Sequence, residues 1–198
     1  MIVCIIIFAA CSLFAARAFH VQAVPNPHTP QSTEQLETGF KEMHGKPSAP
    51  YQIRLLPVSS FPQLPALIAR ELDAKGCLIP QTYEAHEPEN VIRGSFEKSG
   101  SNDWAVLCSV KGITNLYVFF GSNLAEPIAL RSQADSKWLG KDWSQDYGSA
   151  WGISTMSADV MPRVDQFDHD GIEDAFIEQS AVVHYYVKGR WASYETSQ

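Results

Sequence analysis

The chain has few basic residues, and they do not form a run. Its 198 residues contain 15 Lys and Arg against 22 Asp and Glu, a formal net charge of −7 at pH 7. A nucleic-acid-binding protein would carry a clustered basic face, and an anionic membrane surface would attract a basic segment. The composition therefore argues against nucleic acid as a partner, while acidity itself mainly favours solubility.

The sequence also lacks the motifs of common enzyme classes. It has no nucleophile elbow G-x-S-x-G, no H-E-x-x-H, no P-loop and no dinucleotide fingerprint. His86-Glu87 is not followed by the second His of a zinc site. A Ser–His–Asp triad is a spatial arrangement that an inventory of residues does not reveal. We therefore assign no catalytic residue from the sequence.

The N-terminus predicts export. "MIVCIIIFAACSLFAARA" is apolar from Ile2 to Ala16 and ends in the A-x-A pattern of Ala16-Arg17-Ala18. This pattern is typical of a secretory signal peptide over residues 1–18, with a periplasmic or extracellular destination. One alternative is a membrane anchor, although the run is shorter than the roughly 20 residues of a spanning helix. Another is a lipoprotein anchored at Cys11, since "FAAC" resembles a lipobox. With the leader removed, no membrane span is expected in the mature chain.

Cysteine is scarce after the leader. Only Cys77 and Cys108 remain, and no C-x-x-C occurs, so neither a redox motif nor a cysteine zinc site is supported. In an oxidising compartment two cysteines predict one disulfide. Its loop closure is worth roughly 3–4 kcal/mol on the loop-entropy model. The alternative is a pair of buried free thiols.

Composition divides the rest of the chain into two parts. Residues 19–50 are rich in Pro, Ser, Thr and Gln and poor in large apolar side chains, which predicts a flexible linker. A marginal helix over 34–43 is the alternative there. The folded domain is expected over 51–198.

The domain is expected to be α+β, an antiparallel β-sheet meander with one packed N-terminal helix. "YQIRLLPV" suggests an edge strand that ends at Pro57. Ser60 and Gln63 have capping-box spacing before an apolar helical face, and Gly76 suits the helix end. From Asn90 onward, short segments rich in Val, Ile and aromatics alternate with turn residues, which is typical of antiparallel strands. Lys188-Gly189 predicts a hairpin turn.

Two segments align with each other without a gap, "SFEKSGSNDWAV" (95–106) and "QFDHDGIEDAFI" (166–177). The matched pairs are Phe96 with Phe167, Gly100 with Gly171, and Asp103 with Asp174. This strand–loop–strand unit resembles the FG-GAP/VCBS-type repeat, whose loop reads roughly D-x-D-x-D-G-x-x-D. The resemblance implies a calcium-binding loop, but two copies are too few for a β-propeller, which needs at least about four blades. The wider stretch around "CLIPQTYEAHEPENVIRGSF" is similar to exported bacterial proteins with no assigned activity.

The second of these loops carries the predicted metal site. Calcium requires six to eight oxygen ligands gathered by a tightly turning loop. Side chains at alternate positions can converge, and Gly171 permits the turn. The candidate ligands are Gln166, Asp168, Asp170 and Asp174. The alternative is that these acids cap turns by accepting hydrogen bonds from nearby backbone amides. The loop is not an EF-hand, because Ile177 stands where a bidentate Glu is needed.

A second candidate site is aromatic. The stretch "KWLGKDWSQDYGSAWG" places aromatic side chains among polar residues, where they could stack on sugars or anchor a protein. The residues are Trp138, Trp143, Tyr147 and Trp151. The alternative is that they fill the core.

Together these observations predict an exported, periplasmic or extracellular binding or structural domain without catalysis, with calcium (Ca2+) as a candidate stabiliser. Its expected partner is an envelope protein or a glycan. The alternative is a small cell-envelope hydrolase. A carboxylate or His that lies in a cleft beside a hydrogen-bonding partner would favour the hydrolase.

Overall fold

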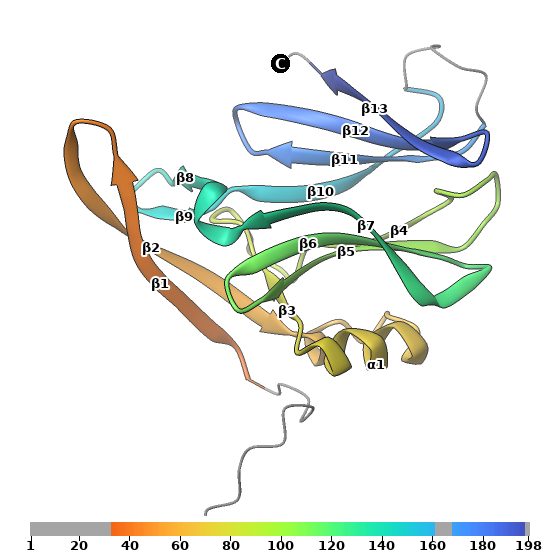
Figure 1. Ribbon diagram of the computed structural model, residues 1–198, viewed down its shortest axis with the longest axis horizontal. Coiled ribbons are helices and arrows are strands. Elements are labelled where there is room, and N and C mark those ends of the chain that lie inside the picture. Colours follow the sequence, from red (N-terminus) through yellow and green to blue (C-terminus); the bar gives the residue numbers. More distant parts are fainter. Residues whose placement is uncertain (1–32, 161–167, 197–198) are drawn as a thin grey trace, which may run out of the picture.

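A computed structural model of the chain describes residues 33–160 and 168–196, which form two β-sheets and one α-helix (Figure 1). The larger sheet has the strand order β7-β6-β5-β3-β2-β9-β8, with β1 added beside β2 and β4 beside β5. Its strands are β1 (Gln35–Met43), β2 (Lys46–Pro57), β3 (Leu78–Pro80), β4 (Val91–Gly94), β5 (Asp103–Val110), β6 (Ile113–Phe120), β7 (Asn123–Ala134), β8 (Leu139–Lys141) and β9 (Tyr147–Ser149). The smaller sheet is β10 (Trp151–Met156), β11 (Gly171–Phe176), β12 (Ser180–Val187) and β13 (Arg190–Thr196). Short 3-10 turns are η1 (Val58–Ser60) and η2 (Asp135–Lys137), and the helix is α1 (Ala66–Lys75).

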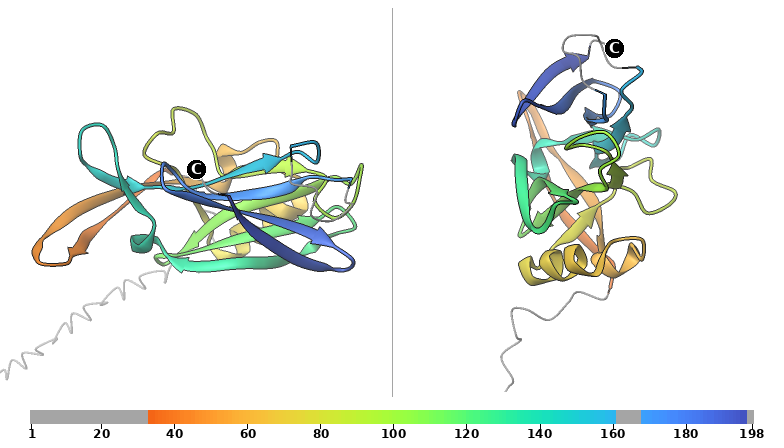
Figure 2. Two further views of the ribbon diagram at one scale, coloured as in Figure 1. Left: turned by 90° about the horizontal axis from the view of Figure 1, so that it is seen from above. Right: turned by 90° about the vertical axis from the view of Figure 1, so that its right-hand side faces the viewer.

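The molecule has three layers. In Figures 1 and 2 the smaller sheet lies on one side of β4–β7 and helix α1 lies on the other. Strand β5 is buried on both faces because its side chains alternate between two cores. Trp104, Val106 and Cys108 pack toward α1, whose Ile68 and Leu72 are fully buried. Ala105 and Leu107 pack toward the smaller sheet. The α+β class predicted from the sequence is therefore confirmed.

The local signals of the C-terminal half are also confirmed. Strands occur in each of the segments rich in Val, Ile and aromatics after Asn90. Lys188 and Gly189 both have positive φ, 51° and 78°, as a two-residue type I′ hairpin requires. Gly76 ends α1 in the left-handed conformation, with φ 72°.

The predicted linker is wrong for its second half. Residues 35–57 form an antiparallel hairpin of β1 and β2, here called the arm, which projects from the body in Figure 1. The marginal helix over 34–43 is likewise wrong. Strand β2 satisfies the backbone hydrogen bonds of β1, so residues 35–43 need little apolar burial to be ordered. The local sequence signal for this hairpin is the pair His44-Gly45, because Gly45 takes φ 69° in the turn between the two strands. Residues 19–32, and the predicted signal peptide before them, lie outside the described residues.

Two smaller expectations also need correction. Strand β2 is not an edge strand, because it pairs with β1 on one side and with β3 and β9 on the other. The Ser60–Gln63 capping box does not form. The helix begins at Ala66 after Pro65, with no side-chain cap, and Ser60 belongs to η1. Pro65 fixes its own φ near the value that a helix requires, so the helix can begin directly after it.

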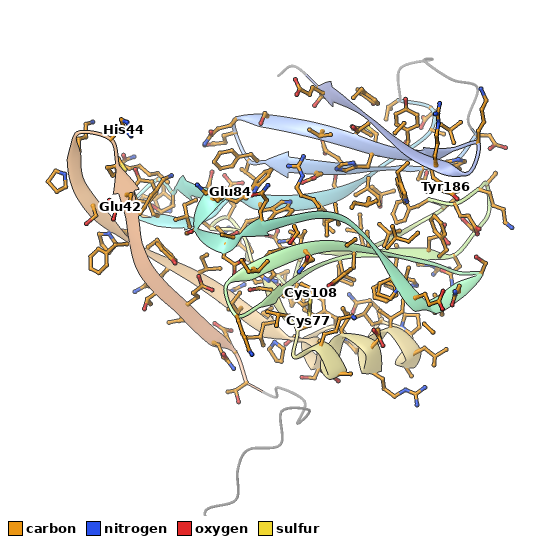
Figure 3. The ribbon with its side chains drawn as sticks, in the orientation of Figure 1. Glu42, His44, Cys77, Glu84, Cys108 and Tyr186 are labelled. Atoms are coloured by element: carbon orange, nitrogen blue, oxygen red, sulfur yellow. A yellow bond between two sulfur atoms is a disulfide. The ribbon has the colours of Figure 1, made fainter. Side chains whose placement is uncertain are left out.

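The disulfide between Cys77 and Cys108 is confirmed. Its Cα atoms are 5.3 Å apart and its residues are separated by 31 positions. Figure 3 shows both cysteines just above α1. Because Cys77 follows the helix end directly, the bond attaches α1 to the central strand β5.

Candidate functional site

The four aromatics predicted as one binding surface are divided between core and surface. Trp151 is only 1% exposed and stacks on Trp138, with ring centroids 4.8 Å apart. Tyr147 is partly buried and lies beneath the ammonium of Lys41. Trp143 alone of the four is fully at the surface, with 93% of its area exposed. The prediction of a common surface is therefore wrong for Trp151. This residue belongs to the core, because burial of an indole between two sheets is more favourable than its exposure to water.

Trp143 stands at the rim of a pocket of about 660 Å³, here called the Trp143 pocket. Three loops meet there, the loop after β3, the β8–β9 turn and the β11–β12 turn. They contribute an aromatic platform, an amide, a lysine, a histidine and three carboxylates. The lining residues are Tyr83, Glu84, His86, Lys141, Asp142, Trp143, Gln145 and Glu178. Glu84 is labelled in Figure 3.

Two glycines hold Tyr83 in this pocket. A Cβ on Gly140 would lie 2.8 Å from the Tyr83 ring, and a Cβ on Gly148 would lie 2.9 Å from the Tyr83 Cβ. Only glycine at both positions lets the ring pack flat against β8 and β9. The backbone N–H of Tyr83 donates to the carbonyl of Ser149 at 2.8 Å, which fixes the main chain as well.

The electrostatics of the pocket are acidic. The Tyr83 hydroxyl lies 3.4 Å from a carboxylate oxygen of Glu178. Burial, followed by the charges of Glu178, Glu84 and Asp142, raises the pKa of Tyr83 to about 12. The phenol therefore stays protonated and can donate a hydrogen bond at any physiological pH. The surrounding carboxylates disfavour an anionic ligand.

Two residues that line the pocket adopt a backbone conformation that non-glycine residues rarely take. Gln145 has φ 70° and Glu178 has φ 61°. A left-handed residue with a side chain costs about 1–2 kcal/mol relative to glycine. Both residues lie in tight turns between strands, where a left-handed residue is part of the turn geometry, as at Lys188.

The predicted calcium ligands do not all face one point. Gln166 lies outside the described residues. Asp168 is exposed, and the Asp170 carboxylate accepts the backbone N–H of Ser95 at 2.9 Å. Asp174 is 1% exposed and lies between the sheets rather than in the loop. No cluster of three or more metal-ligating side chains occurs among the described residues. Calcium binding therefore stays a prediction.

Calcium binding to the native protein would raise its thermal stability in proportion to the logarithm of calcium concentration. The measurement compares the unfolding midpoint in millimolar calcium with that in chelator. An Asp168→Asn variant should lose the increase if Asp168 is a ligand. An unchanged midpoint in the wild type would contradict the prediction.

The Asp174 carboxylate is occupied by three donors. The indole N–H of Trp151 donates to one oxygen at 2.7 Å. His184 Nε2 and Arg131 Nε approach the other oxygen at 2.9 and 3.1 Å. Arg131 comes from the larger sheet and the other three from the smaller one, so the network joins the two sheets. Its role is structural, and it explains why His184 is not free for other chemistry.

The two aligned segments touch each other in space. Ser95 from the first accepts the backbone N–H of Asp170 from the second, at 2.9 Å. Their matched acids, Asp103 and Asp174, are both buried, but Asp103 is the first residue of β5 and organises its loop by accepting the N–H groups of Glu97 and Gly121, each at 2.7 Å. The resemblance to FG-GAP/VCBS units stays a prediction.

The histidine of the second loop is buried. His169 is only 7% exposed, with Nδ1 3.3 Å from the carbonyl oxygen of Asp170. Its burial follows from the contact between the two loops, which lies outside the reach of local sequence patterns.

Sequence reasoning missed most of the Trp143 pocket. Tyr83, Glu84 and Glu178 carry no motif, and they come from loops far apart in the chain. The only local signal was the pair Gly140 and Gly148, which flank the turn that presents Trp143. Neither glycine has positive φ, so their purpose becomes visible only once Tyr83 lies against them.

No helix among the described residues has both the length and the apolar character needed to cross a membrane.

Comparisons with known proteins identify no family for this chain. Protein-family models, curated proteins and solved structures were all compared with it, and none matches.

Proposed function

We propose that this protein is an exported, non-catalytic binding domain whose Trp143 pocket takes a glycan without acidic groups. The observation that carries the proposal is the 93% exposed indole of Trp143 at the rim of a concave, polar pocket. A single exposed apolar side chain is ordinary, but Trp143 differs from exposed Phe40 in lining a pocket with polar groups around it. The disulfide supports export, because such bonds persist in oxidising compartments.

The chemistry of the pocket fits a sugar. A sugar ring presents an apolar C–H face that stacks on an indole, and hydroxyls that need hydrogen-bond partners. The carboxylates of Glu84, Asp142 and Glu178 can accept hydrogens from those hydroxyls, and the oxygen of the Tyr83 phenol, which donates its hydrogen to Glu178, can accept one more. The same carboxylates would repel uronic acids or sulfated sugars.

Replacing Trp143 with alanine should weaken binding of neutral oligosaccharides roughly two- to tenfold, because an aromatic stacking contact is worth about 0.5–1.5 kcal/mol and about 1.4 kcal/mol is tenfold. Isothermal titration with chitin and malto-oligosaccharides, after a screen on a glycan array, would measure the loss. Phe40→Ala is the matched control, since Phe40 is 69% exposed and does not line the pocket.

Glu178→Gly separates binding from folding. Glycine suits the left-handed backbone at this position, so stability should stay within about 1 kcal/mol of the wild type. Affinity should still fall, because the carboxylate is gone. If no neutral glycan binds at millimolar concentration, and an envelope protein is captured in a Trp143-dependent manner instead, the glycan proposal is wrong.

The hydrolase alternative has weaker support. Glu37 lines a second cleft, and burial and the charge of Asp135 raise the pKa of its carboxyl. However, Asp135 is only 4% exposed, and its oxygens already accept the hydroxyl hydrogens of Ser109 and Thr114. A carboxylate held in this way has little capacity to activate water.

A further inference from the structure

Another hollow adjoins the Trp143 pocket. It has a volume of about 290 Å³ and is here called the Arg54 hollow. Its lining comes from β2, from the loop after β3, and from β9 with the turn before it. Tyr83 and Asp142 line both the Arg54 hollow and the Trp143 pocket. The two hollows therefore share a wall, and a ligand that stacks on Trp143 can continue past Tyr83 if it is longer than one sugar ring.

The loop after β3, which carries Tyr83, is held in place by buried polar contacts. The backbone N–H of Gln81 donates to the carbonyl of Arg54 at 2.8 Å. The Gln81 side chain is 1% exposed, and its amide donates to the carbonyl of Glu89 at 3.1 Å and accepts the Glu89 N–H at 2.9 Å. The Glu89 carboxylate accepts the N–H of Thr82 at 2.8 Å. The shared wall is therefore preorganised, which limits the entropy that a ligand loses on binding.

Arg54 brings hydrogen-bond donors to the hollow that the protein itself barely uses. The side chain is partly buried, and its Nη2 lies 3.5 Å from the carbonyl oxygen of Ala85, which is a long hydrogen bond. Arg54 takes part in none of the ion pairs within residues 33–160 and 168–196. A guanidinium carries several N–H donors in a planar fork, so most of them remain available to a ligand.

The charges around Arg54 decide which kind of acceptor fits. Asp142 and Asp146 line the same hollow, and their turn is fixed because the Asp146 N–H donates to the Asp142 carboxylate at 2.9 Å. Two carboxylates beside one guanidinium leave no excess of positive charge, so a carboxylate or sulfate group on a ligand is not attracted. An uncharged carbonyl oxygen is attracted, because a hydrogen bond from a charged donor is stronger than one between neutral groups.

Resting on the glycan function proposed above, we propose that the ligand is an N-acetylated oligosaccharide that spans both hollows. One sugar stacks on Trp143, where carboxylates accept hydrogens from its hydroxyls. A neighbouring sugar lies in the Arg54 hollow, and the guanidinium donates to the carbonyl oxygen of its acetamido group. Leu36, which lines the same hollow and is 61% exposed, offers an apolar contact to the acetamido methyl. The hollow thus matches both halves of that group.

Isothermal titration of the full protein with chitin oligosaccharides, from the disaccharide to the pentasaccharide, tests the proposal. Affinity should rise with length until both hollows are occupied and then level off. Cello-oligosaccharides provide the matched ligands, because they share the chitin linkage and carry a hydroxyl in place of the acetamido group. The wild type should bind the chitin pentasaccharide about tenfold more tightly than the cello-pentasaccharide, the usual effect of one hydrogen bond from a charged donor.

Variants assign this preference to Arg54. Arg54→Gln should remove it by weakening only the chitin series, whereas Trp143→Ala should weaken both series by the same factor. Arg70→Gln is the matched control, since Arg70 is exposed on α1 and lines neither hollow. If Arg54→Gln does not fold, Arg54→Lys provides the second variant. It keeps the stem and the charge but loses the planar fork, so it should retain only part of the preference.

The outcomes separate this proposal from the glycan function on which it rests. Equal affinity of the wild type for the two series, affinity that does not change with length, or a preference that persists in folded Arg54→Gln would overturn the proposal and leave the glycan function standing. Binding of malto-oligosaccharides in preference to both series would do the same. If no oligosaccharide of any series binds, the glycan function itself is wrong, and this proposal with it.

Discussion

Replacing Asp174 with alanine should destabilise the protein by about 3–5 kcal/mol, the usual effect of removing one partner from a buried ion pair. The carboxylate is 1% exposed and serves Trp151, His184 and Arg131 at once. Without it, the Arg131 guanidinium, whose side chain is 25% exposed, loses its counter-charge. The buried indole N–H of Trp151 also loses its acceptor. Domains of this kind are stable by only about 5–15 kcal/mol, so the loss would be severe.

Urea unfolding followed by fluorescence would measure this loss, with two comparisons. Asp174→Asn retains an acceptor for Trp151 but not the charge for Arg131, and should lie between alanine and wild type. Glu173→Ala is the matched control. Glu173 is the preceding residue on the opposite face of β11, where it bonds only the exposed Ser154 hydroxyl, and its loss should stay below about 1 kcal/mol. An Asp174→Ala effect as small as that of Glu173→Ala would show that the network does not hold the sheets together.

Removing the Cys77–Cys108 disulfide should cost about 2–5 kcal/mol, and loop-closure entropy alone accounts for roughly 3–4 kcal/mol of this. Both residues are buried, at 1% and 0% exposure, so the double Cys→Ala variant avoids burying a serine hydroxyl. Because the bond attaches the end of α1 to β5, the helix and the packing of its Ile68 and Leu72 against β5 should be the first structure lost. The unfolding midpoint in urea and the helical signal in circular dichroism would report both effects.

Peptide mapping provides the chemical control. Unreduced digests should contain residues 77 and 108 in one cross-linked peptide, which separates on reduction. Cys77→Ala alone should be about as unstable as the double variant, since either change abolishes the bond. Two separate thiol peptides in the unreduced digest would contradict the disulfide.

Local patterns predicted the elements whose cause is local. Gly76 ends α1 and Lys188-Gly189 makes a type I′ turn because these positions need positive φ, a requirement visible in the sequence. Buried strands such as β5 follow from dense β-branched and aromatic residues. The disulfide followed from a count of two cysteines after the leader in a chain that the sequence predicts to be exported.

The arm was not predicted from the sequence, because the amino-acid composition of residues 19–50 indicates a linker and does not reveal that two strands pair there. Residues 35–43 are polar and would not be ordered alone, yet their register with β2, from Gln35 opposite Leu55 to Met43 opposite Lys46, satisfies their backbone groups. Half of the side chains then face the body. Glu37 then lies where the charge of Asp135 adds to burial in raising its pKa, which no spacing rule could have indicated.

The sequence by itself therefore determined the compartment expected, the strand-rich class, the turns and the one disulfide, since each depends on composition or on the conformation of a few neighbouring residues. The tertiary structure alone decided which aromatics are core and which is surface, and which acids meet. Tyr83 reaches Glu178 across 95 positions of sequence, and Arg131 reaches Asp174 from another sheet. Such contacts depend on how sheets and loops pack together, because the interactions that stabilise a site join segments that are far apart in the sequence.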